Sequence, residues 1–256
     1  MGESKPRQPI APTRSDVTHG TRSAQSPATL MRLRRNRYLV LLATLIVALL
    51  VQSVDNRLPA WELIVDLPVS LSSIVVALAV FSDRRSRIYS LWWGSAMVAL
   101  ALLRHLFPDS AHFWLELTLR PLSALFLGWA TSLILRDVFE QTRIRIDDVV
   151  GAVCGYLLAA GAWANLYDLL EVLHPGAFLV GAELAQRLDD WHGRSALFHY
   201  FSLATLTSVG YGDIVPVRGP GTILAMLETV FGQFYIAVVV AQLVGMRLAQ
   251  GPRGSP

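Results

Sequence analysis

The chain has 256 residues, of which 53% are hydrophobic and only 16% are charged, and its formal net charge is +3. This apolar fraction exceeds what a soluble domain of the same size needs, so the composition predicts a membrane protein. The small excess of positive charge is attributed to membrane topology, and we expect neither a nucleic-acid partner nor a soluble substrate.

The amino-terminal residues 1–37 are rich in Pro, Ser, Thr and basic side chains, with almost no apolar pattern. Such a segment cannot bury enough apolar surface to order itself. It is predicted to be a disordered, basic cytoplasmic tail.

Six apolar segments of membrane-spanning length follow. The first four are grouped as a four-helix transmembrane domain over residues 38–145, and the last two belong to a pore domain over residues 146–250. Their predicted bounds are 38–54, 63–81, 88–107, 115–135, 149–170 and 222–248.

The fourth segment carries few charged residues. A voltage sensor needs several Arg or Lys residues at three-residue spacing, and this segment offers only Arg120 and Arg136, about 24 Å apart along a helix. We therefore expect no charge-ladder voltage sensor. One expectation is a salt bridge between Arg120 and Asp66. The alternative is that each side chain reaches the membrane interface separately.

A short helix and a glycine-containing loop separate the fifth and sixth segments. The predicted helix, residues 195–206, is too short to span a bilayer of about 30 Å, so it is expected to re-enter the membrane. The loop reads Thr207-Ser208-Val209-Gly210-Tyr211-Gly212-Asp213. Glycine at every second position permits positive φ, which turns successive carbonyls toward one axis. We call residues 207–213 the filter loop; the alternative is an ordinary surface turn.

Basic residues are concentrated in every second connection between the predicted spans, and this pattern predicts the orientation of the chain in the membrane. They gather in the amino-terminal tail, after the second and fourth segments, and at the end of the sixth. These regions lie on one side if there are six spans, and the positive-inside rule makes that side cytoplasmic. The prediction is a multi-pass cell-membrane protein with both termini cytoplasmic, a short cytoplasmic tail at residues 251–256, and an outward filter loop.

The filter loop, the short helix and the flanking spans resemble the tetrameric potassium channel superfamily. Over about residues 149–250 the chain is similar to bacterial ion-channel-domain proteins and to the pores of two-pore-domain channels. The resemblance implies potassium ions bound at Ser208, Val209, Gly210 and Tyr211, with Ser208 standing where the family usually has Thr. Because one filter loop cannot surround an ion, the predicted assembly is a homotetramer within membrane lipid.

The resemblance also assigns roles behind the filter loop and along the sixth span. Tyr200 and Phe201 stand where relatives pack aromatic rings on the filter tyrosine. Gly232 stands at the family's hinge glycine, although close packing would equally explain a glycine there. Glu228 is expected either to support the filter loop or to contact the fifth span. Helical spacing suggests a cavity-lining stripe of Gln233, Ile236, Val240 and Val244.

The predicted function is passive, potassium-selective conduction, with K⁺ as the permeant ion and no cofactor. The alternatives are a non-conducting or regulatory membrane scaffold that retains a pore domain, and a transporter of the kind with single-glycine filters. No nucleophile–base or metal-ligand set stands out, so an enzyme is not expected. His174 and His192 in the outer segment are either acid sensors or solvated side chains. Cys154 is expected to be a small packing residue.

Overall fold

The computed structural model describes residue 2 and residues 37–53, 88, 92–96, 99, 112–140, 146–188, 191–217 and 219–249. The predicted second span lies outside these residues, and the predicted third span is described only in fragments. Most of the amino-terminal tail and all of residues 251–256 also lie outside them.

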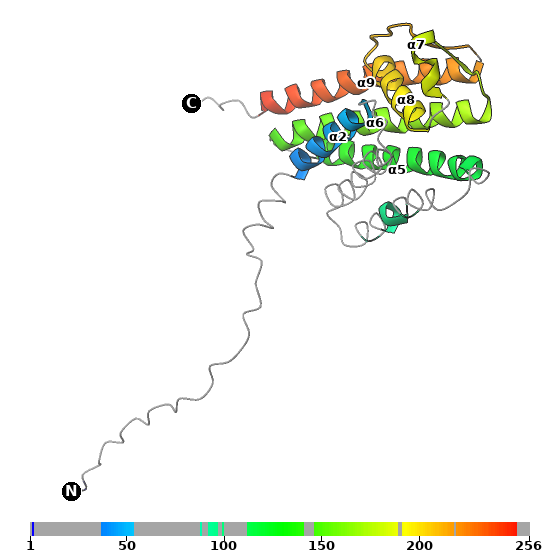
Figure 1. Ribbon diagram of the computed structural model, residues 1–256. Helices are drawn as coiled ribbons and strands as arrows, with labels where there is room; N and C mark the ends of the chain where they lie inside the picture. The colour runs from blue at the N-terminus through cyan, green and yellow to red at the C-terminus, as the bar shows by residue number, and fades with distance from the viewer. Residues whose placement is uncertain are drawn as a thin grey trace.

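Four apolar helices form the body of the described structure: α2 (Arg37–Ser53), α5 (His112–Glu140), α6 (Ile146–Leu173) and α9 (Gly219–Ala249). Three of them, over Phe113–Glu140, Ile146–Leu173 and Gly219–Leu248, are long and apolar enough to cross a membrane, and α2 is a shorter apolar helix. The long helices lie alongside one another, and the shorter elements gather at one end of them (Figure 1). The described part is thus an all-helical membrane bundle with a small cap.

Helix α6 is the central helix, in contact with α2, α5, α8 and α9. Its glycines allow neighbouring side chains to approach closely. A Cβ added at Gly151 would lie 3.1 Å from the ring of Tyr38 on α2, and one added at Gly155 would lie 2.6 Å from the hydroxyl of Tyr235 on α9. Small residues at such positions are typical of helix packing in membranes.

The cap at the end of α6 contains short regular elements. The outer segment that carries His174 and His192 includes strand β1 (Phe178–Val180), helix α7 (Ala182–Ala185) and the 3-10 turn η2 (Gln186–Leu188). Strand β1 pairs antiparallel with β2 (Ile214–Pro216), with Leu179 opposite Val215. The pairing fastens the outer segment to the residues that follow the filter loop.

The short helix α8 (Trp191–Leu206) begins four residues before the predicted start at residue 195. Helix α9 also begins earlier than predicted. The predicted sixth span starts at residue 222, whereas the preceding residues Gly219-Pro220-Gly221 form the first turn of α9. Proline is compatible with this position because the first turn of a helix leaves its N–H groups unpaired in any case.

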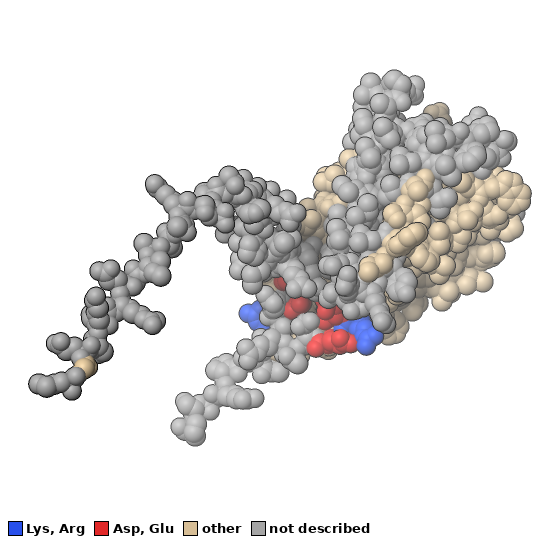
Figure 2. Space-filling view, turned by 90° about the horizontal axis from the view of Figure 1, so that it is seen from below, with Lys and Arg blue, Asp and Glu red and all other residues tan. Residues whose placement is uncertain are grey.

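The outer surface is consistent with a lipid environment. On the face shown in Figure 2, the described charged side chains occupy one small area, and the rest of the described surface is uncharged. Large apolar side chains of α9, among them Met226, Val230 and Phe234, are exposed on the isolated chain. Exposed apolar surface of this extent indicates contact with lipid or with another protein chain.

Candidate functional site

The backbone of the filter loop alternates between two conformations. Ser208, Gly210 and Gly212 have φ values of 58°, 53° and 81°, so every second residue is left-handed. The amide groups of Val209 and Gly210 donate to the carbonyl oxygen of Ala204, at 2.8 and 3.2 Å. Among the described hydrogen bonds, none is accepted by a backbone carbonyl of residues 207–212, whose side chains are exposed. The loop therefore keeps a row of unpaired carbonyl oxygens, held by its amide groups to the end of α8.

Side chains of α8 hold the outer half of the filter loop. The ring of Tyr211 stacks on Tyr200, with centroids 5.9 Å apart and planes inclined by 11°. The Tyr200 hydroxyl donates to Asp213 Oδ2 at 2.7 Å. Tyr200 thus contacts both Tyr211 and Asp213.

Phe201, the other predicted filter support, lies on a different side of α8. Its ring centroid is 4.9 Å from that of Tyr167 on α6 and 5.6 Å from that of Phe178 on β1. These aromatic rings are part of the buried cluster that joins α6, α8 and the cap. Phe201 therefore anchors α8 in the bundle, and its described ring contacts are with this cluster and not with Tyr211.

The inner half of the filter loop is held from α6 and α9. Gln233 donates from Nε2 to the Ser208 hydroxyl oxygen at 2.8 Å. Tyr156 donates to the carbonyl oxygen of Leu206 at 2.9 Å. A Cβ added at Gly232 would lie only 2.2 Å from that same carbonyl oxygen. The end of α8 therefore rests against α9 at Gly232, which supports the packing explanation for this glycine, and α9 continues through it as one helix.

The remaining predicted stripe residues on α9 are exposed on the isolated chain. Ile236, Val240 and Val244 are 44%, 51% and 53% exposed. Gln233 is also exposed apart from its bond to Ser208. The stripe is free to face another chain or an aqueous cavity.

Glu228 is fully buried and joins three helices. Its Oε2 accepts a hydrogen bond from the Tyr167 hydroxyl of α6 at 2.5 Å. Its Oε1 lies 2.5 Å from Ser202 Oγ of α8, which is also 2.8 Å from the carbonyl oxygen of Ala160. A serine hydroxyl has one proton, and the Ala160 carbonyl only accepts. Both short contacts are satisfied when the Glu228 carboxyl is neutral and donates to Ser202. Glu228 thus contacts the fifth span through Tyr167 and the helix that precedes the filter loop through Ser202, and support of the filter loop itself stays a prediction.

This arrangement predicts that Glu228→Gln preserves the fold. An amide can donate to Ser202 and accept from Tyr167. Glu228→Leu leaves the buried Tyr167 hydroxyl without an acceptor, at about 1–3 kcal/mol, and removes the hydrogen bond that Ser202 accepts, while Ser202 still donates to Ala160. In thermal unfolding of the purified protein, the Gln variant is expected to lie close to wild type and the Leu variant well below it. Equal decreases in the unfolding temperature of the two variants would contradict the hydrogen bonds assigned to Glu228.

A cluster of buried charges joins α5 and α6 to the start of α8. Asp168 of α6 is 1% exposed and pairs with Arg120 of α5 at 2.6 Å and with Arg194 of α8 at 2.7 Å. Arg194 also pairs with Glu116 of α5. The guanidinium carbon of Arg120 lies 3.7 Å from the ring centroid of Trp191. Two positive and two negative groups balance within the cluster.

Arg120 is therefore paired with Asp168, while the predicted partner Asp66 lies outside the described residues. Arg120 is 6% exposed, so its head group is enclosed by protein and does not reach the interface by itself. No prediction from the sequence covered Glu116, Asp168 or Arg194. Charged residues inside apolar segments are rare and usually paired, and that signal was present for Glu116 and Asp168.

The other singled-out residues have simple surroundings. Cys154 is buried, and its thiol contacts the Tyr38 carbonyl oxygen at 3.4 Å, as expected for a packing residue. His174 is exposed, and the side chain of His192 is outside the described set. Among the described residues, no group of three or more His, Cys, Asp or Glu side chains is placed to hold a metal ion.

One comparison with known proteins gives a broad class for the carboxyl-terminal part of the chain. Residues 177–247 match the family model described as "Ion channel". Protein LctB of Bacillus caldotenax is 32% identical over 125 residues, covering 48% of this chain and 89% of the relative. Protein LctB of Geobacillus stearothermophilus is 31% identical over 127 residues, with the same coverage. No solved structure matched the chain.

Proposed function

We propose that this chain, which belongs to the family of the LctB proteins and matches the family model described as "Ion channel" over residues 177–247, is the subunit of a potassium-selective channel. Conduction is passive, down the electrochemical gradient. The ion-binding groups are the carbonyl oxygens of the filter loop, principally those of Ser208, Val209, Gly210 and Tyr211. The Ser208 hydroxyl provides the innermost oxygen ligands.

The observation that carries this proposal is the alternation of positive φ at Ser208, Gly210 and Gly212. In an extended strand successive carbonyls point in opposite directions. A left-handed residue at every second position turns them toward one side, where oxygen atoms can replace the hydration shell of K⁺. The lack of described hydrogen-bond donors to these carbonyls leaves them available to an ion.

Four copies of the chain complete the site. One filter loop offers oxygens from one side only, and fourfold rotation about a common axis surrounds the ion. A homotetramer also gives the exposed stripe of α9 a central cavity to line, with Gln233 nearest the filter loop. Chain–chain contacts then cover part of the exposed apolar surface of α9.

The proposed membrane arrangement has six spans per chain and a re-entrant α8. A helix of 16 residues is about 24 Å long, shorter than the hydrocarbon core of about 30 Å. Chain reversal at the filter loop then returns the backbone to the outer face through β2. Basic residues near the cytoplasmic ends orient the protein in the cell membrane.

Replacing Gly210 by Ala tests the function directly. Left-handed φ costs a residue with a Cβ about 1–2 kcal/mol, and a flipped carbonyl would leave the ion-binding row. We expect Gly210→Ala to lose most potassium-over-sodium selectivity in flux from proteoliposomes, while membrane insertion is preserved.

The matched control is Gly128→Ala in α5, where an added Cβ meets nothing within 4 Å. This variant is expected to keep the selectivity of the wild type. Unchanged potassium-over-sodium selectivity in Gly210→Ala would contradict the ion-binding role proposed for the filter loop.

A further inference from the structure

The carboxyl end of α8 is capped by the first residues of the filter loop. A helix leaves its last four carbonyl groups without partners inside the helix. Here the amide group of Val209 donates to the carbonyl oxygen of Ala204 at 2.8 Å, and the Ser208 amide donates to Thr205 at 2.9 Å. Together these two bonds form a Schellman motif, in which Ser208 follows the helix cap. Ser208 therefore belongs to the cap and is also the first residue of the proposed ion-binding row.

Serine is an unusual residue at this position of the cap. The motif requires a left-handed conformation there, which glycine normally supplies because it has no Cβ. Ser208 has a φ of 58° and is the one non-glycine residue with positive φ among those that the structure describes. Its backbone is strained, since the Cβ approaches the following carbonyl oxygen. Strain of this kind persists where the surrounding structure holds the residue in place.

Gln233 of α9 contacts the Ser208 side chain. Its Nε2 donates to Ser208 Oγ at 2.8 Å, and within the described part of the chain this is the one hydrogen bond of that hydroxyl. The preceding residue brings the two side chains within reach. A Cβ at Gly232 would lie 2.2 Å from the carbonyl oxygen of Leu206, so a glycine lets α9 pass close to the end of α8.

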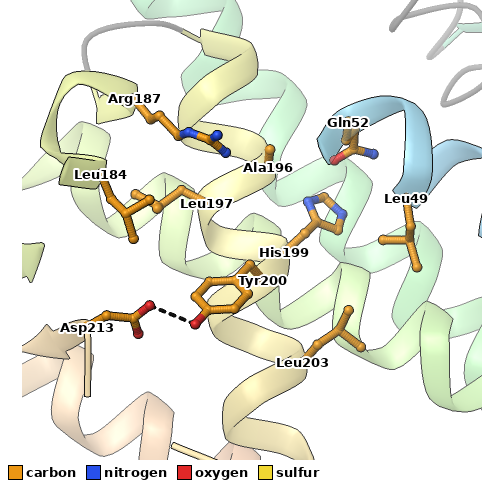
Figure 3. Close-up of a pocket in the computed structure, with 10 residues that line it drawn as sticks. All are labelled: Leu49, Gln52, Leu184, Arg187, Ala196, Leu197, His199, Tyr200, Leu203 and Asp213. Carbon is orange, nitrogen blue, oxygen red and sulfur yellow. Dashed lines mark hydrogen bonds between the residues drawn. The ribbon is translucent and has the colours of Figure 1, made fainter. Parts of the chain in front are cut away.

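The two ends of the filter loop are held by different helices. At the outer end, Tyr200 of α8 donates to Asp213 Oδ2 at 2.7 Å, and Figure 3 shows this bond at the edge of the cavity beside α8. At the inner end, the side-chain contact to Ser208 comes from Gln233 of α9. The positions of the inner and outer ends therefore depend on separate contacts.

We propose that Gln233 is a positioning residue for the innermost ion site, an inference that rests on the proposed function. Its amide group keeps Ser208 in the left-handed conformation and fixes the side-chain rotamer of the hydroxyl. A hydroxyl oxygen has two lone pairs, so Oγ accepts from Gln233 with one and keeps the other for a potassium ion. The bond offsets the strain of serine in the cap, and the chain thereby retains a hydroxyl ligand that glycine would lack.

A double-mutant cycle in thermal unfolding of the purified full-length protein tests this bond. Gln233→Leu is expected to lower the unfolding temperature by about 2–4 °C more in the wild-type background than in Ser208→Gly, which lacks both the hydroxyl and the strain. Effects of leucine that do not depend on Ser208 cancel in this difference. Equal effects of Gln233→Leu in the two backgrounds would overturn the proposal.

Thr229→Val is the matched control on the same helix. It also replaces a polar side chain by an apolar one, and it removes a hydrogen bond at 2.9 Å from Thr229 Oγ1 to the Ala225 carbonyl oxygen within α9. Its effect on the unfolding temperature should be the same in the wild-type and Ser208→Gly backgrounds.

Barium block of potassium flux from proteoliposomes reports on the ion site itself. Ba²⁺ resembles K⁺ in size and carries a second charge, so it binds to the same oxygen ligands. Gln233→Leu is expected to raise the half-blocking barium concentration about tenfold, the size of one hydrogen bond. Gln233→Asn should do the same, because its amide is one methylene too short to reach Ser208. An unchanged value in both variants would overturn the proposal, and so would a rise in Gln233→Leu alone, which would point to cavity polarity.

The two measurements separate failure of this proposal from failure of the proposed function. Potassium-selective, barium-sensitive flux in the wild type with unchanged barium block in both Gln233 variants would refute the positioning role alone. Non-selective flux in the wild type would refute the proposed function, whereas coupling in the unfolding cycle would still support the bond by which Gln233 holds Ser208.

Discussion

Gly232→Ala is expected to prevent formation of a stable, conducting assembly. The added Cβ would lie 2.2 Å from the Leu206 carbonyl oxygen and 3.0 Å from its carbonyl carbon, and these backbone atoms cannot rotate away. Relief of the clash requires the end of α8 to move, together with the filter loop that follows it. Alanine gains about 1 kcal/mol of helix propensity over glycine, but overpacking costs about 1–3 kcal/mol or more. The cost of the clash therefore exceeds the gain in helix propensity, and Gly232→Ala is expected to lower the stability.

The measurement is thermal unfolding in detergent, combined with the yield of the assembled oligomer. Gly245→Ala on the same helix is the control, because a Cβ there meets nothing within 4 Å on the same chain. It should unfold at or above the wild-type temperature. A Gly232→Ala variant that assembles and unfolds like Gly245→Ala would show that α8 does not rest on α9 as described.

Asp168→Asn is expected to destabilise the protein severely. The carboxylate pairs with two buried guanidinium groups, and a neutral amide in its place would remove the charge that faces Arg120 and one of the two charges that face Arg194. Removing one partner of a buried ion pair costs about 3–5 kcal/mol. Because Arg194 and Trp191 belong to the first turn of α8, the loss should loosen that helix and lower potassium selectivity as well.

An exposed ion pair provides the comparison. Arg136 and Glu140 are separated by 2.7 Å but are 74% and 64% exposed, so Glu140→Gln should cost less than about 1 kcal/mol. The double variant Arg120→Gln with Asp168→Asn keeps the Arg194–Glu116 pair and restores charge balance. It should be more stable than Asp168→Asn alone. If Asp168→Asn unfolds no earlier than Glu140→Gln, the cluster does not stabilise the fold.

The helices and the filter loop were predictable because each carries its own local signal. Helices α6 and α9 are long apolar segments, and their predicted bounds differ from the observed ones by three residues or fewer at each end. Gly210 and Gly212 were predicted to have positive φ, and both do. In each case the physical requirement falls on residues close together in the sequence.

Features that depend on distant contacts were not predictable in the same way. The first turn of α8 contains Trp191 and Arg194, which show no apolar pattern. That turn is packed and paired by Arg120, Glu116 and Asp168 from two other helices. Strand β1 has only three residues, and its partner lies beyond the filter loop. Gly232 was compatible with hinge or packing until the position of Leu206 was known.

Potassium selectivity is tested by ion flux from proteoliposomes that contain the purified wild-type protein. Sodium is the comparison ion, and barium is the blocker. We expect potassium flux well above sodium flux, and loss of the potassium flux on addition of barium. Equal, barium-insensitive flux of the two ions would contradict potassium selectivity and the role assigned to the carbonyl oxygens of the filter loop.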